Sequence, residues 1–104
     1  MPERLIVEVD QDLSDLIPPF LAHKRADTQT IIAAAEQNDY DVIDHLSHRL
    51  KGEGASYGFP VLTDLGRRLE AAAHQRDVKA VKQWASELLQ YLERVEVVYQ
   101  ASEG

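Results

Sequence analysis

His48 is the side chain of this sequence that points most clearly to chemistry. An accessible imidazole with one unprotonated ring nitrogen is a nucleophile near neutral pH and needs no activating base. Lys51 follows three residues later, where on a shared helix its ammonium group could reach an anion bonded to the ring. Gly52, one turn after His48, has no side chain that could cover the imidazole. The spacing predicts a nucleophile that a partner can approach, with a cation beside it.

The helix that should position His48 runs from residue 41 to about residue 56. Its core-facing stripe consists of four apolar residues that share one arc at about 100° per residue, namely Val42, Ile43, Leu46 and Leu50. His48 points nearly opposite this stripe, so its ring should face water, and Ala55 projects on the same side. Most exposed histidines are only solvated surface residues, so exposure alone does not decide the role of His48.

Three further residues of this helix require an explanation. Glycine within a helix costs about 0.5–1 kcal/mol relative to alanine, and access to His48 explains Gly52. Gly54 falls towards the bundle, which predicts a close approach of the neighbouring helix. Glu53 falls on the core side, where a carboxylate needs a partner, so we expect it to emerge at the end of the bundle or to pair with an arginine such as Arg67.

The remaining sequence also predicts helices. After an extended start at residues 5–9, apolar spacing and punctuation by proline and glycine place helices at 12–17, 19–37, 41–56, 60–75 and 77–100. The last helix has the most regular pattern, with Asp77 as its N-cap and apolar residues at alternating spacings of three and four at Val78, Val81, Ala85, Leu88, Leu92, Val95 and Tyr99. Because the connections are short, we expect one all-α domain over residues 1–104, an antiparallel up-down four-helix bundle with an additional short N-terminal helix and no strand.

Composition excludes several classes of function. The chain has 104 residues, of which 44% are apolar and 28% charged, as is usual for one soluble globular domain. A net charge of −7 disfavours contact with nucleic acid. The chain has no cysteine for a disulfide or a thiolate metal site. We expect a cytoplasmic monomer with no membrane segment, because no stretch approaches the roughly 20 apolar residues of a spanning helix.

The motif His48-Arg49-Leu50-Lys51-Gly52, followed by Gly54-Ala55-Ser56-Tyr57-Gly58 and Leu62, Leu65 and Leu69-Glu70, closely resembles the histidine-containing phosphotransfer (HPt) domain. The resemblance runs on through the final helix and covers nearly the whole chain. By position, His48 matches the phosphorylated residue, Lys51 the lysine of the motif and Gly52 the residue that gives the ring room. Glu53 departs from the small residue usual in the family.

The resemblance implies a phosphoryl carrier of two-component phosphorelays. His48 would accept a phosphoryl group from an aspartyl phosphate on the receiver domain of a response regulator or hybrid sensor kinase and pass it onward, reversibly. The receiver would supply its own aspartate, lysine and Mg²⁺, so we expect no cofactor bound by this chain and no kinase or ATPase activity. His45, Arg49 and Ala55 should border the partner-binding face. Because the chain starts with methionine we favour a free-standing shuttle, with a domain cut from a larger hybrid kinase as the alternative.

Two other interpretations remain open. A metal-binding bundle could use Asp41, Asp44, His45 and His48, which share one helix face, or the pair Glu70 and His74. Ligands in such bundles project inward, whereas these residues lie opposite the apolar stripe, so we expect no metal site. A non-catalytic helical adaptor, in which His48 is incidental, is the second alternative. His23, His45 and His74 are interpreted as ordinary polar residues.

Overall fold

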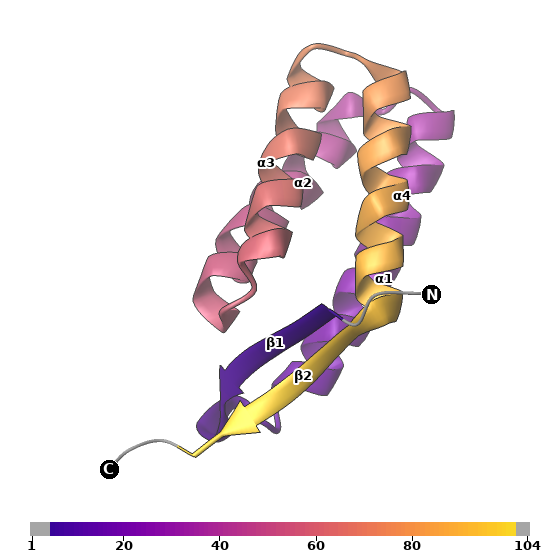
Figure 1. Cartoon of the computed structure of the whole chain (residues 1–104). Coiled ribbons are helices and arrows are strands. Elements are labelled where there is room, and N and C mark those ends of the chain that lie inside the picture. The colour runs from indigo at the N-terminus through magenta and orange to yellow at the C-terminus, as the bar shows by residue number, and fades with distance from the viewer. Residues whose placement is uncertain (1–4, 102–104) are drawn as a thin grey trace.

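The computed structural model describes residues 5–101. Four long helices pack into a bundle, and a two-stranded sheet lies at one end of it (Figure 1). The helices are α1 (Ile17–Glu36), α2 (Tyr40–Tyr57), α3 (Pro60–His74) and α4 (Val78–Arg94). The predicted helical bundle is therefore confirmed. No helix in the described part of the chain combines the length and the apolar character needed to cross a membrane.

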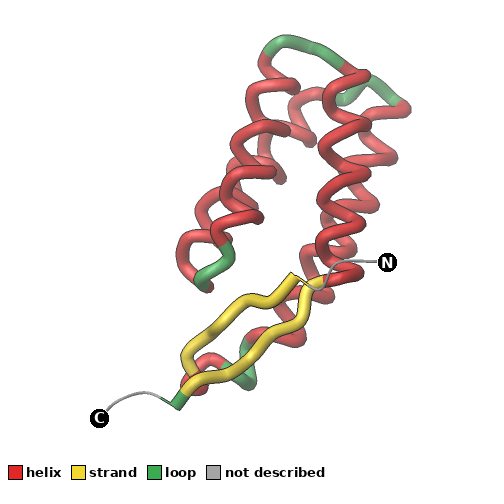
Figure 2. The backbone as a smooth tube through the Cα atoms, in the orientation of Figure 1, coloured by secondary structure: helices red, strands yellow, loops and turns green. Residues whose placement is uncertain are grey.

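Local signals in the sequence explain where the helices begin and end. The side chains of Asp39 and Asp77 accept hydrogen bonds from Val42 N and Ala80 N, and these bonds satisfy donors in the first turns of α2 and α4. Gly58 ends α2 at φ 84°, in the left-handed region that glycine adopts without a steric penalty. Each helix begins within a few residues of the end of the preceding one, so the connections between successive helices are short (Figure 2).

The core lies between the four helices. Helix α2 packs most extensively on α3, and α1 and α4 complete a ring in which every helix contacts two others. The stripe predicted for the last helix is confirmed for four residues that are fully buried, namely Val81, Ala85, Leu88 and Leu92. The core-facing residues Ile43, Leu46 and Leu50 of α2 are also buried, so the predicted apolar stripe of this helix faces the core.

The absence of strands and the helix over 77–100 were wrong predictions. Helix α4 ends at Arg94, and Val95–Gln100 form β2, which pairs in parallel with β1 (Leu5–Asp10) in the register Leu5↔Val95 to Asp10↔Gln100. Valine and tyrosine favour strands, and their spacing in this segment also fits a helix. The extended segment β1 supplies the partner that decides between the two structures.

The short N-terminal helix over 12–17 was also placed incorrectly. Only Gln11–Leu13 form a helical turn, of the 3₁₀ type, and the Asp10 side chain accepts a hydrogen bond from Asp12 N at 2.8 Å. Helix α1 begins at Ile17, two residues before the predicted start at Pro19, so both Pro18 and Pro19 lie within its first turn. Proline is tolerated there because the first N–H groups of a helix have no intrahelical acceptor.

Candidate functional site

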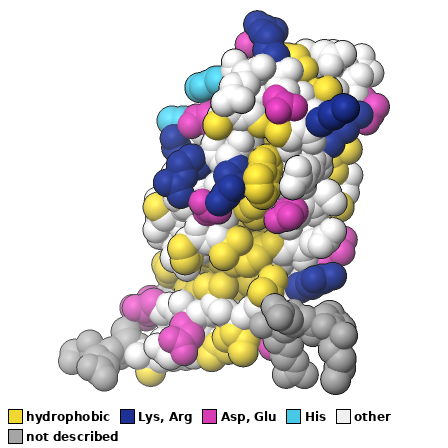
Figure 3. Space-filling view, turned by 45° about the horizontal axis from the view of Figure 1, so that its top comes forward, with side chains coloured by type: hydrophobic (Ala, Val, Ile, Leu, Met, Phe, Trp, Pro, Cys, Tyr) yellow, Lys and Arg dark blue, Asp and Glu magenta, His cyan; other side chains and the backbone are white. Residues whose placement is uncertain are grey.

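The imidazole of His48 lies on the outer surface of α2, as predicted. Its side chain is 71% exposed, while Leu46 and Leu50 on the opposite side of the helix are buried. Figure 3 shows histidine side chains at one margin of the molecule, beside a group of lysine, arginine, aspartate and glutamate side chains. The side chain of His48, the predicted nucleophile, is therefore open to solvent.

Glu70 of α3 is the partner of His48. Its Oε2 atom lies 2.8 Å from His48 Nδ1, and its Oε1 atom accepts a hydrogen bond of 2.8 Å from Lys51 Nζ. The hydrogen bond from Lys51, and the weaker one from His48, hold the pKa of Glu70 below its usual value although burial opposes this shift. Glu70 is thus an ionised, acceptor-only group that links the two predicted residues.

The ionised carboxylate also determines the tautomer of His48. An acceptor-only group can bond to Nδ1 only if Nδ1 carries a hydrogen. In the neutral ring the lone pair then resides on Nε2, the atom remote from Glu70. The arrangement presents Nε2 as the nucleophilic atom and leaves the proton on the side of the ring that faces the protein.

Glycines set the spacing of α2 and α3 around this site. A Cβ atom on Gly66 would lie 2.7 Å from Lys51 N, and one on Gly54 would lie 2.7 Å from Thr63 N, so each glycine permits a close approach of backbone to backbone. The close approach predicted for Gly54 is confirmed. A Cβ atom on Gly52 would meet nothing within 4 Å, as expected for a position that opens onto solvent.

Arg49 belongs to an ionic network on the side of α2 that faces α1. Lys24 is only 1% exposed and donates hydrogen bonds to Asp27 at 2.7 Å and to Glu53, while Arg49 donates to Asp27 at 2.9 Å. Burial alone would raise the pKa of Asp27, but the hydrogen bonds from Lys24 and Arg49 lower it. Two cations and two carboxylates therefore balance one another where α1 packs on α2.

Glu53 pairs with an arginine, as one of the two expectations had it, but the arginine is Arg49, at 3.7 Å, and not Arg67. Arg67 and Arg68 both bond to Asp64 of their own helix, at 3.0 and 2.9 Å, whereas Lys24 pairs with Glu53. The sequence gives no signal for Lys24, because a lysine is not expected at a core-facing position of α1, and only packing against α2 brings Glu53 to its ammonium group. Asp64 partly compensates the positive charge of Arg67 and Arg68.

The other predicted residues lie around His48 without joining its hydrogen bonds. His45 and Ala55 are exposed on α2, before and after the histidine. His74 Nε2 lies 2.6 Å from Asp44 Oδ1, at ion-pair distance but without the geometry of a hydrogen bond. Residues 5–101 contain no group of three or more His, Asp or Glu side chains that could hold a metal ion. Glu70 and His74, paired in the metal interpretation, face different partners.

The family model described as the Hpt domain matches residues 4–97 of the 104. The chain belongs to the Hpt domain family. No curated protein and no solved structure matches it. Membership in the Hpt family supports the role of a phosphohistidine carrier in phosphorelays. Such a role needs an accessible histidine, and this Hpt domain has one exposed on its second helix.

Glu70 is the site residue of this Hpt domain that the sequence did not reveal. It belongs to the motif, and its spacing from His74, four residues later on α3, suggested a pair between those two residues. Its contact with His48 joins residues 22 positions apart and depends on the register of α3 against α2. Helical periodicity shows on which side of α3 Glu70 lies. It does not show that this side faces α2, which only the close packing of Gly66 on α2 reveals.

Proposed function

We propose that this Hpt domain is a phosphotransfer protein in which His48 reversibly accepts a phosphoryl group from an aspartyl phosphate on a receiver domain and passes it to another receiver. The observation that carries the proposal is the exposed ring of His48, with Nδ1 bonded to the ionised Glu70 and Nε2 left for the partner. The proposal includes a monomer in the cytoplasm with the up-down helix order expected from the short connections.

The geometry around His48 supports direct transfer of the phosphoryl group from the receiver's aspartate to Nε2. The lone pair of His48 Nε2 forms the N–P bond while the P–O bond to the receiver's aspartate breaks, and the aspartate leaves as a carboxylate. The proton stays on Nδ1, where Glu70 balances the positive charge that the ring acquires. Lys51 uses one N–H donor on Glu70 and retains two for phosphoryl oxygens, which fits its proposed role in charge neutralisation.

The receiver completes the site in this proposal. Phosphoryl transfer requires a divalent cation and in-line positioning, and we propose that the receiver brings Mg²⁺ together with its own aspartate and lysine. His45, Arg49 and Ala55 border His48 and would contact the receiver, while Gly52 leaves room for it beside the ring. The chain then acts as a carrier without kinase or ATPase activity of its own.

The decisive experiment follows radiolabelled phosphate from a phosphorylated receiver onto the protein. We expect an acid-labile, alkali-stable label that disappears in His48→Gln and persists in His45→Gln, a matched change one turn earlier on the same helix. Undiminished labelling of His48→Gln would contradict the proposal. Receiver binding without any labelling of the wild type would instead favour the non-catalytic adaptor.

A further inference from the structure

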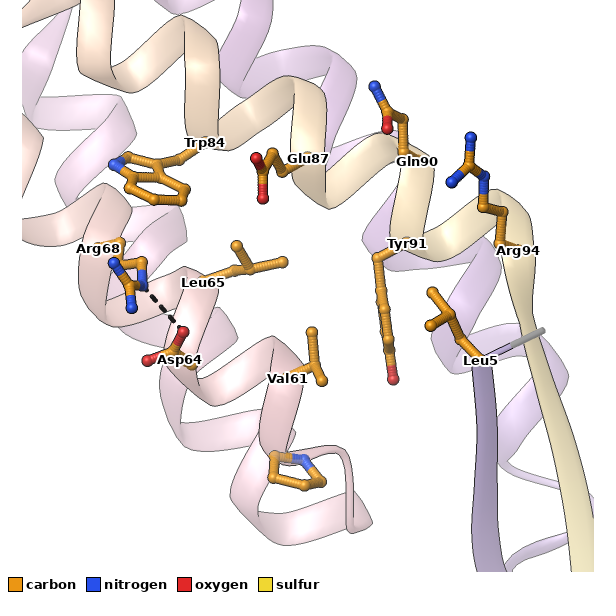
Figure 4. Close-up of a pocket in the computed structure, with 11 residues that line it drawn as sticks. Leu5, Val61, Asp64, Leu65, Arg68, Trp84, Glu87, Gln90, Tyr91 and Arg94 are labelled. Atoms are coloured by element: carbon orange, nitrogen blue, oxygen red, sulfur yellow. Dashed lines mark hydrogen bonds and ion pairs between the residues drawn. The ribbon is translucent and has the colours of Figure 1, made fainter. Parts of the chain in front are cut away.

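A groove lies between α3, α4 and β1, away from His48. Its volume is about 770 Å³, and its walls include Val61 and Leu65 of α3 and Trp84 and Tyr91 of α4 (Figure 4). A second hollow of about 430 Å³ lies against β1 and shares Pro60, Val61 and Tyr91 with the first. Because the two hollows have these walls in common, they form one continuous surface, which we term the β1 groove.

Tyr91 provides a polar atom inside this groove. The residue is 5% exposed, its hydroxyl has no hydrogen-bond partner among residues 5–101, and the ring extends from α4 to a position between Val61 and Leu5 (Figure 4). Burial raises the pKa of Tyr91 to about 12, so the hydroxyl remains protonated. A buried hydroxyl without a partner is unfavourable, and a bound group that supplies an acceptor or a donor would satisfy it.

Glu87 adds a negative charge on the same side of α4, one turn before Tyr91. Its carboxylate points into the space between α3 and α4, whereas Gln90 and Arg94 point away from it (Figure 4). Arg68 on the facing wall is bonded to Asp64 and lies over the ring of Trp84, with 4.8 Å from its Cζ atom to the ring centroid. No ion pair of Glu87 is found within the described range, 5–101, so its charge is available to a ligand.

The free edge of β1 forms the remaining wall. Within residues 5–101, β1 pairs with β2 alone, so its other edge has unpaired backbone groups. Ile6, Val7 and Glu8 all line the hollow, although side chains of successive strand residues alternate between faces. Consecutive residues can line one hollow when the edge of the strand faces it. Such an edge is a template for a further strand.

We propose that the β1 groove binds an extended segment of a partner protein, which pairs with the free edge of β1 and places a lysine or arginine side chain against Glu87. The methylene groups of that side chain would pack on Val61 and Leu65, and backbone or side-chain groups of the segment would bond to the Tyr91 hydroxyl. A basic segment is favoured because Glu8 and Glu87 line the groove and the chain carries a net charge of −7. The same charge disfavours a second copy of this chain.

The β1 groove can be occupied while His48 exchanges phosphate. At about 100° per residue, Glu70 lies on nearly the opposite side of α3 from Val61, Leu65 and Arg68. A partner segment in the groove would therefore leave the His48 surface open. The inference is independent of the proposed phosphotransfer and concerns a second interaction surface.

The test uses the whole ¹⁵N-labelled protein and capped octapeptides in which valine and lysine alternate, in both registers. We expect saturable amide shifts in β1, at Val61 and at Tyr91, with little change at His48 or Lys51. Glu87→Lys should weaken binding about tenfold, because an attraction becomes a repulsion. Glu93→Lys is the matched control, an exposed α4 residue that does not line the groove, and should have a much smaller effect.

Several results would overturn the inference. One such result is a lack of saturable peptide binding, and another is equal affinity for octapeptides with glutamate in place of lysine. The others are an equal loss of peptide affinity in Glu87→Lys and Glu93→Lys, and amide shifts centred on His48. Concentration-dependent dimerisation that Glu87→Lys abolishes would assign the groove to a second copy instead. Phosphotransfer to His48 should be unchanged in Glu87→Lys, so a failure of the proposed function and a failure of this inference give different results.

Discussion

Replacement of Gly52 by alanine should separate stability from function. The added methyl group meets no atom within 4 Å, so it causes no steric conflict inside the protein. Alanine is favoured over glycine within a helix by about 0.5–1 kcal/mol, and the free energy of unfolding should rise by that amount. The same methyl group would stand one turn from His48, on the surface that a receiver would approach in the proposed transfer. We therefore expect slower phosphotransfer from a more stable protein.

Gly66→Ala is the matched control, because it adds the same methyl group on the facing helix. Its Cβ atom would lie 2.7 Å from Lys51 N and 3.0 Å from Ser47 O, which are backbone atoms of α2 that cannot move separately. Overpacking of this kind costs about 1–3 kcal/mol, which exceeds the gain in helix propensity. Urea denaturation and single-turnover transfer would measure both variants. Wild-type transfer rates in Gly52→Ala would refute the steric role of Gly52.

Two further predictions concern charged residues. Glu70→Ala should change His48 from the Nδ1–H tautomer to a mixture of tautomers, visible in ¹⁵N chemical shifts, and should slow transfer. The pKa of Glu70 is lowered from 4.5, so its ionised form stabilises the folded state fully above pH 4.5. This stabilisation is lost as the pH falls through the lower pKa of the folded state. An acid unfolding profile of Glu70→Ala identical to that of the wild type would contradict this stabilising role. Lys24→Met should lower the free energy of unfolding by about 2 kcal/mol, less than for a fully buried pair because Arg49 still compensates the two carboxylates. The exposed Lys82→Met is its control, with an expected change below about 0.5 kcal/mol, and equal losses in the two variants would argue against the buried network.

The part of the site that lies on one helix could be predicted from the sequence. His48, Lys51 and Gly52 lie within two turns of α2, and the apolar stripe of that helix determines which side faces water. The same periodicity predicts that Gly52 faces solvent and that Gly54 lies against the neighbouring helix. These features were predictable because the angle between two residues of a regular helix depends only on their separation along the chain.

Contacts between distant segments were decided by the tertiary structure. Val95–Gln100 fit a helix or a strand by local pattern, and pairing with Leu5–Asp10, at the other end of the chain, selects the strand. The contacts of Glu70 with His48 and of Lys24 with Glu53 join residues 22 and 29 positions apart. They depend on the rotation and register of packed helices, which backbone contacts such as those at Gly66 determine. The sequence alone therefore placed His48 on the outer surface of α2, whereas the carboxylate that bonds to its ring became evident only once α3 was packed on α2.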